Sequence, residues 1–111
     1  MAKAGTVTTE PSVPTIHMAS LGSSGEVVKG ATITEADAVI ERQAGRDVVV
    51  CGLDLSANRQ LAGRIEQSAN GPWRRCPPHA SAGRNSLPHY QPQSRPPTGH
   101  TFYETPHRKA Q

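Results

Sequence analysis

Eight of the ten prolines in this 111-residue chain fall in its last third, at positions 72, 77, 78, 88, 92, 96, 97 and 106. Proline fixes φ and lacks a backbone N–H, so it interrupts helices and is excluded from central strands. Long regular elements are therefore not expected in residues 71–111. The same prolines reduce conformational freedom, so that loops built from them can hold side chains in place without a large core.

Apolar side chains are scarce in this chain. Leu, Ile, Val and Phe contribute 18 residues, which is below the level typical of a well-filled core, although the small net charge of +3 argues against full disorder. No run of ten apolar residues exists, so a transmembrane segment is not expected. Residues 1–20 also lack the apolar stretch of a secretory signal peptide.

The middle of the chain carries the clearest local signals of regular structure. Thr34 is followed by acidic residues, which is the pattern of a helix start, and Gly45 is placed to end that helix in the left-handed conformation. The β-branched run at residues 47–51 predicts a buried strand. Ser56 can cap a second helix, which the Asn-Gly pair at residues 70–71 would end.

These signals predict an α+β fold class, a small single domain over residues 32–111 with two helices around a short sheet. Its proline-rich C-terminal third is expected to be irregular, except that the aromatic residues 100–104 could add a strand beside residues 48–50. Residues 1–31, rich in Thr, Ser, Gly and Pro, are expected to form a flexible arm or linker, in which residues 26–29 have the composition of a short strand.

Charge is divided unevenly along the chain. Residues 1–70 have a net charge of −2, whereas residues 71–111 carry six Lys and Arg against Glu104 alone, a net +5. The basic third also holds four of the five histidines. A segment of this kind fits an anionic partner, most simply nucleic acid, and equally a solvated cationic tail.

The groups that could carry chemistry lie in this basic third. His79, His89 and His100 stand 10 and 11 residues apart, too far for one helix face, so only loops and strands could bring them together. Histidine acts as acid and base near neutral pH, and Arg95 can bind phosphate oxygens in a fork. This set suits metal-free cleavage of RNA, in which one imidazole takes the 2′-hydroxyl proton and another protonates the leaving oxygen.

Two other interpretations stay open. The three histidines with Glu104 could instead bind a divalent metal ion that activates water. The basic third could also belong to a non-catalytic module that binds nucleic acid or protein and orders on contact. Cys51 is most simply a small buried side chain, and a nucleophilic role beside a histidine is the less favoured interpretation.

Aromatic residues are few, and their roles depend on strand geometry. In a strand, side chains alternate, so His100 and Phe102 share a face and Tyr103 takes the other unless a bulge intervenes. Tyr103 is kept among the candidate site residues on that condition. Trp73 and Tyr90 could stack on bases, although packing in so aromatic-poor a chain also needs them.

Five segments carry a resemblance to a known family: residues 47–52, 58–62, 78–79, 87–91 and 99–104, the last with the sequence GHTFYE. Together they resemble the C-terminal toxin domains of bacterial polymorphic toxins, many of which are nucleases with histidine-rich sites. The resemblance covers residues 32–110, roughly.

This resemblance implies a toxin that acts on RNA or DNA in a neighbouring cell and that is held in check by a small cognate immunity protein. Such a chain is cytoplasmic in the producing cell or delivered into a target cell as part of a larger effector. We therefore expect an RNA-cleaving, toxin-like nuclease that needs no cofactor. Its site residues would be His89, His100, His79, Arg95 and Tyr103.

Overall fold

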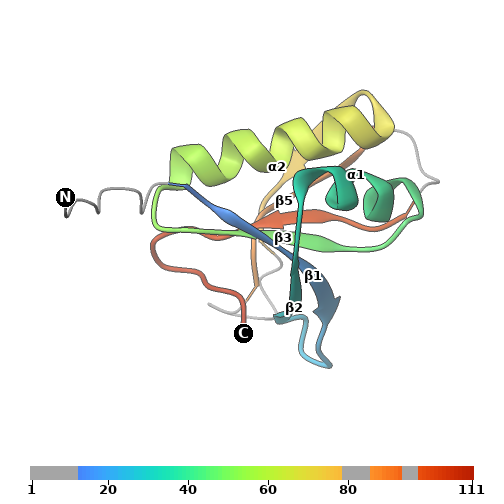
Figure 1. Cartoon of the computed structure of the whole chain (residues 1–111). Coiled ribbons are helices and arrows are strands. Elements are labelled where there is room, and N and C mark those ends of the chain that lie inside the picture. The colour runs from blue at the N-terminus through green and yellow to red at the C-terminus, as the bar shows by residue number, and fades with distance from the viewer. Residues whose placement is uncertain (1–12, 79–85, 94–97) are drawn as a thin grey trace, which may run out of the picture.

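The computed structural model describes residues 13–78, 86–93 and 98–111, and in that part of the chain two helices lie on one side of a six-stranded sheet (Figure 1). This is the α+β fold class that the sequence predicts. The elements follow in the order β1 (Thr15–Leu21), β2 (Val27–Ile33), α1 (Glu35–Gln43), β3 (Val48–Cys51), α2 (Leu55–Asn70), β4 (Trp73–Cys76), β5 (His89–Pro92) and β6 (Thr101–Tyr103). Neither described helix is long and apolar enough to cross a membrane.

The strands are ordered β2-β1-β3-β6-β5-β4, so a strand from the C-terminal third lies next to the central β3. β3 and β6 are parallel, with Val48 opposite Thr101 and Val50 opposite Tyr103, whereas the other neighbouring pairs are antiparallel. The predicted strand beside residues 48–50 is therefore confirmed. This parallel pairing also places the residues that precede the two strands next to each other.

Both helices cover the same face of the sheet, and the main core lies between the helices and the sheet (Figure 1). Its buried side chains come from both helices and from four of the strands: Ile16, Ala38, Val48, Val50, Leu61, Ala62, Ile65, Tyr90 and Tyr103. Full burial of one large aliphatic side chain stabilises a fold by about 1.5–3 kcal/mol. A core of this size explains how so apolar-poor a sequence forms a defined structure.

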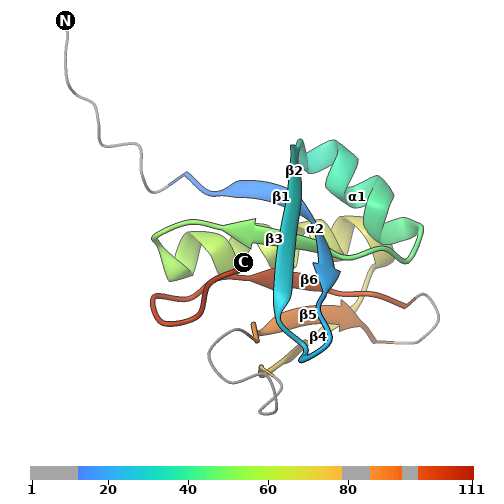
Figure 2. The ribbon, with the colours of Figure 1, turned by 90° about the horizontal axis from the view of Figure 1, so that it is seen from below.

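The β1–β2 hairpin extends across the opposite face of the sheet (Figure 2). The pairing of β1 with β2 shifts register between His17 and Ala19, an irregularity of the kind that increases strand twist. A second, smaller apolar cluster is buried on this face, formed by Val27, Val49, Cys51, Leu87 and Phe102. Each face of the sheet is therefore packed.

The helix boundaries follow from side-chain capping. Thr34 caps α1, its Oγ1 accepting from the backbone N–H of Asp37 at 3.1 Å. Gly45, just beyond the end of α1, has φ +84°, the left-handed conformation expected of it. The N-cap of α2 is Asp54, two residues before the predicted Ser56, because the Asp54 carboxylate accepts from the N–H groups of Ser56 and Ala57.

The predicted arm of residues 1–31 is corrected by the structure from Thr15 onward. β1 and β2 belong to the sheet, where only residues 26–29 were expected to be a strand. β1 pairs with β3, which is distant in sequence, so no local sequence pattern predicts that β1 is a strand. Two further short strands, β4 and β5, form in the C-terminal third, where irregular structure is expected apart from residues 100–104.

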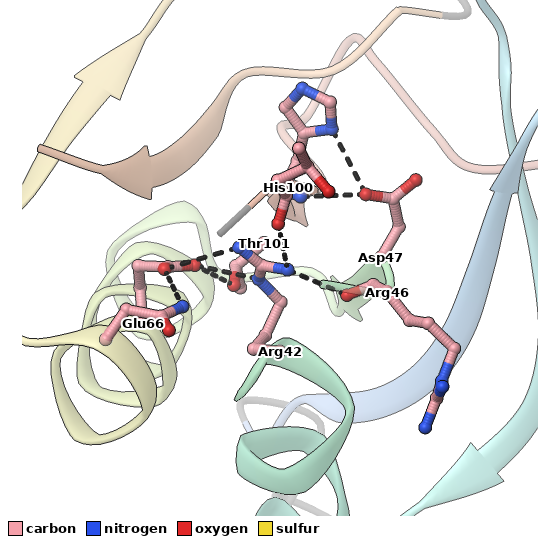
Figure 3. A network of polar contacts seen from close by, with 8 residues as sticks. Arg42, Arg46, Asp47, Glu66, His100 and Thr101 are labelled. Carbon is pink, nitrogen blue, oxygen red and sulfur yellow. Dashed lines mark hydrogen bonds and ion pairs between the residues drawn. The ribbon is translucent and has the colours of Figure 1, made fainter. Parts of the chain in front are cut away.

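A buried ion pair joins α1 to α2. Nε of Arg42 donates to Oε1 of Glu66 at 2.9 Å, and both side chains are 0% exposed. Glu66 also accepts from Oγ1 of Thr101 at 2.8 Å and from Nδ2 of Asn70 at 2.6 Å (Figure 3). Two charges can be buried at a tolerable cost only when their remaining polar atoms are also bonded, and this network meets that condition.

Replacing Glu66 with alanine should lower the free energy of unfolding by about 3–5 kcal/mol, because it leaves the Arg42 charge buried and unpaired. Urea denaturation followed by circular dichroism measures the change. The matched control is Glu35→Ala, which breaks the exposed pair that Glu35 forms with Arg64 and should lower the same quantity by at most about 1 kcal/mol. Similar losses in both variants would contradict this account of the network.

Candidate functional site

The structure brings His89 and His100 together on the face opposite the helices. Their ring centroids are 4.7 Å apart and the rings meet edge to face, with 78° between their planes. His89 opens β5 and lies opposite Phe102 in the register, and the Phe102 ring contacts both imidazoles. Two of the three predicted histidines therefore lie together, although one belongs to β5 and the other directly precedes β6.

Asp47 holds the His100 side chain in position. Its Oδ1 accepts from the backbone N–H of His100 at 2.7 Å and lies 3.1 Å from Nδ1 of the ring (Figure 3). The contact follows from the parallel pairing of β3 and β6, since Asp47 precedes Val48 and His100 precedes its partner Thr101. An ionised carboxylate only accepts, so this contact assigns the Nδ1 position to a donating N–H.

The two imidazoles differ in their access to solvent. The side chain of His100 is 20% exposed, and that of Asp47 is 19% exposed. His89 is only 2% exposed, and its Nδ1 lies 3.5 Å from the carbonyl oxygen of Leu87. In Figure 3 the second ring nitrogen of His100 points away from Asp47. A ligand would therefore meet the pair from the His100 side.

The buried ion pair also supports this site. Nη1 of Arg42 donates to the carbonyl oxygens of Arg46 at 2.9 Å and Thr98 at 3.1 Å. These carbonyls lie just before Asp47 and just before Gly99, so one guanidinium holds both segments that lead into the Asp47–His100 contact. Gly99 has φ +91°, and a Cβ there would lie 2.7 Å from the carbonyl oxygen of Gly45. Only glycine lets the two segments approach so closely.

Tyr103 is not brought to the histidine pair. It lies on the helix-covered face, where its ring is 5.6 Å from that of Tyr90, centroid to centroid. No bulge reverses the alternation of β6, whose register with β3 is regular over the described residues. The condition for a site role therefore fails, and Tyr103 is a buried core residue.

Glu104 is also occupied elsewhere. Its Oε1 accepts from the N–H of Gly52 at 3.2 Å and its Oε2 from the N–H of Ala110 at 2.9 Å. It thus fastens the C-terminal tail to the end of β3. Across residues 13–78, 86–93 and 98–111, no group of three His, Cys, Asp or Glu side chains is placed to hold a metal ion. His79 and Arg95 lie outside the described residues, and their roles stay predictions.

Cys51 lies in the smaller apolar cluster. Burial raises the pKa of its thiol to about 12, and the neighbouring Glu104 carboxylate adds to the rise. Because the thiolate is the nucleophilic form, this environment disfavours the interpretation of Cys51 as a nucleophile. Its role is to fill space beneath the hairpin.

The sequence does not predict a role for Asp47 at the site; it predicts only that residues 47–51 form a strand. A signal for it exists in the sequence: if residues 100–104 pair in parallel with residues 48–50, the residues preceding the two strands become neighbours. The sheet face that carries His89 and His100 also carries Arg74. It faces Gln91 in the register, and Gln91 alternates with Tyr90 so that it shares the face of His89.

Comparisons of the chain with models of known protein families, with curated proteins and with solved structures give no significant match. What the chain can do is therefore argued from its own residues, and the resemblance to polymorphic toxin domains stays a prediction.

The raised pKa of Cys51 predicts that this thiol resists alkylation in the folded protein. At pH 8 its thiolate fraction should be about a thousandfold below that of a free cysteine, and burial slows the reagent further. Iodoacetamide labelling followed by peptide mass spectrometry measures both cysteines in one sample. Cys76, which is only partly buried, is the internal control and should be labelled first. Labelling of Cys51 at the rate of Cys76 in the folded protein would contradict the prediction.

Proposed function

We propose that this chain is a nuclease that cleaves RNA without a metal ion, with His100 and His89 as its acid–base pair. The observation that carries the proposal is the pair itself: two imidazoles with centroids 4.7 Å apart, one of them oriented by a carboxylate. Proton transfer by two positioned histidines is the chemistry that cleavage at a 2′-hydroxyl requires. The resemblance to toxin domains is consistent with this activity.

His100 is the general base in this scheme. With its Nδ1–H directed at Asp47, the neutral ring presents Nε2 as an acceptor toward the open side of the site. Nε2 takes the proton of the 2′-hydroxyl as that oxygen attacks phosphorus. The bond from phosphorus to the 5′-oxygen breaks, and a 2′,3′-cyclic phosphate forms. Asp47 acts through His100 and is a positioning residue.

His89 is the general acid in the same step. Protonated His89 would donate to the departing 5′-oxygen, so that the proton removed at one oxygen is balanced by one supplied at the other. Its low exposure means that the leaving oxygen must come close to the His100–His89 edge. Phe102 supports both rings from the side and fixes the angle between them.

Positive charge near the pair supports binding of a phosphodiester. Arg74 supplies a guanidinium on the same face, and such a group binds two phosphate oxygens at once. Arg95 as the phosphate clamp and His79 as a third contributor remain part of the proposal, with the net +5 of residues 71–111 favouring both. A cognate immunity protein remains the expected protein partner.

Replacing His100 with alanine should lower the rate of RNA cleavage by about 100-fold to 10,000-fold, because one proton transfer loses its catalyst. The assay follows cleavage of a fluorophore-quencher RNA oligonucleotide, and mass spectrometry identifies the cyclic phosphate product. His107→Ala removes an imidazole from an exposed position of the tail and should leave the rate unchanged. Equal rates for the wild type and His100→Ala would overturn the proposal.

Replacing Asp47 with asparagine should reduce kcat more than it raises KM, since the uncharged amide can turn its NH2 toward Nδ1 of His100 and favour the wrong tautomer while the RNA contacts remain. Activity that disappears with EDTA and returns with a divalent ion would show metal-dependent hydrolysis instead. Tight, salt-sensitive RNA binding without any turnover would show a non-catalytic binding module.

A further inference from the structure

A second cluster of basic and aromatic side chains lies on the helix-covered face. Arg75 of β4 faces Tyr90 of β5 in the register, and Arg59 of α2 approaches the same phenol from above the sheet. Burial and then Tyr103 raise the pKa of Tyr90, whereas the positive charges of Arg75 and Arg59 oppose the rise. Both guanidinium groups are therefore close to one uncharged hydroxyl.

These two arginines have no anionic partner among the described residues. Carboxylates pair with Arg42, Arg46 and Arg64, but none pairs with Arg59 or Arg75 in that part of the chain. Nε of Arg59 is buried and has no hydrogen-bond partner among the described residues, and Cζ of Arg59 lies 6.0 Å from the centroid of the Tyr103 ring. A buried donor left without an acceptor costs free energy, and two like charges near one hydroxyl add repulsion. An anion placed between them would relieve both.

Trp73 adds an aromatic surface beside this cationic pair. Its ring meets that of Tyr90 edge to face, with centroids 4.5 Å apart, and 37% of the residue is exposed. Gly63 of α2 lies over Tyr90, where a Cβ would be 3.5 Å from Cζ of that ring, so the helix packs closely on the phenol. Arginines beside an exposed aromatic ring are the combination by which proteins bind single-stranded nucleic acid, phosphate on the cation and base on the ring.

The edge of the sheet connects this cluster to the histidine site. β4 is an edge strand, and the alternation of its side chains directs Arg74 to the histidine face and Arg75 to the helix face. A strand of nucleic acid that passes around this edge would meet a guanidinium on either side. The cluster can therefore contact a portion of the chain whose cleavage point lies at His100.

We propose that Arg59, Arg75 and Trp73 form a second contact site for single-stranded RNA, in which the arginines hold a phosphate and Trp73 stacks on a base. The inference rests on the proposed function, since it extends the same substrate from the histidine pair around the β4 edge. This second contact site lies away from the reacting atoms. It favours an unpaired strand over a duplex, because the bases of a duplex are not free to stack on Trp73.

The test uses the single tryptophan of the chain as its own reporter. A ten-nucleotide RNA with 2′-O-methyl groups, which lacks the attacking hydroxyl, is titrated into the full-length wild-type protein while Trp73 fluorescence is followed. Stacking should quench the fluorescence saturably. The double variant Arg59→Gln/Arg75→Gln should weaken binding by about tenfold or more, and the slope of log K against log salt should fall by about 0.7, since the contact with one phosphate of a single strand is lost.

The matched control is Arg46→Gln/Arg64→Gln, which removes the same charge from two exposed arginines elsewhere. It should leave affinity within about twofold, because the effect of general charge on binding is small compared with direct phosphate contacts. Arg75→Gln alone guards against a folding defect from the partly buried Arg59, and should weaken binding in the same direction by a smaller factor. Equal weakening by the control pair, or saturable binding without quenching, would overturn the proposal.

Two further arms separate the alternatives. If a polyglutamate peptide quenches Trp73 in an Arg75-dependent manner and RNA does not, the site serves an acidic protein and the RNA proposal is overturned. If the wild type binds RNA with the predicted Arg59 and Arg75 dependence but never cleaves the unmodified oligonucleotide, the proposed function fails while this site stands. Cleavage that proceeds with unchanged KM in Arg59→Gln/Arg75→Gln overturns the site and leaves the function standing.

Discussion

The arrangement of this molecule depends on the buried ion pair between Arg42 and Glu66. The Glu66 carboxylate accepts hydrogen bonds from side chains of α1, α2 and β6, and the Arg42 guanidinium binds the backbone just before each of the two parallel strands. Such a network tolerates few alternative packings, because any displacement would leave a charge or a polar atom buried without a partner. It therefore sets where β6 begins, and with it the place of His100. The same contacts that stabilise the fold align the candidate site.

The side chains of residues 100–103 alternate between the two faces of the sheet. Thr101 and Tyr103 point toward the helices, the first to Glu66 and the second into the main core. His100 and Phe102 point to the other face, where they meet His89. β6 is thus held by contacts on the helix side, while His100, directly before it, faces the opposite side with Phe102. This division also explains why Tyr103 cannot join the histidines without a bulge.

Elements that depend on local residue patterns can be predicted from the sequence, whereas elements that depend on pairing between distant strands cannot. Caps and glycines delimit α1 and the end of α2, and the three valines of β3 mark a buried strand, so these elements and the α+β class are recoverable. The β1–β2 hairpin cannot be predicted in this way, because its apolar residues are scattered and β1 is defined by its pairing with the distant β3. Asp47 is missed for a related reason. Its role appears only when the register of a parallel pair, formed across α2, β4 and β5, is known.

The uneven charge of the chain has a structural counterpart at the edge of the sheet. Carboxylates of the first seventy residues are largely committed within the fold: Glu35, Glu41 and Glu66 pair with arginines from the same region, and Asp47 holds His100. In the described residues, by contrast, Arg74 and Arg75 have no carboxylate partner. Flanking prolines keep β4 short and in an edge position, where its guanidinium groups meet solvent on both faces. Two of the six basic residues of the last third therefore lie side by side on this edge strand, one directed to each face of the sheet.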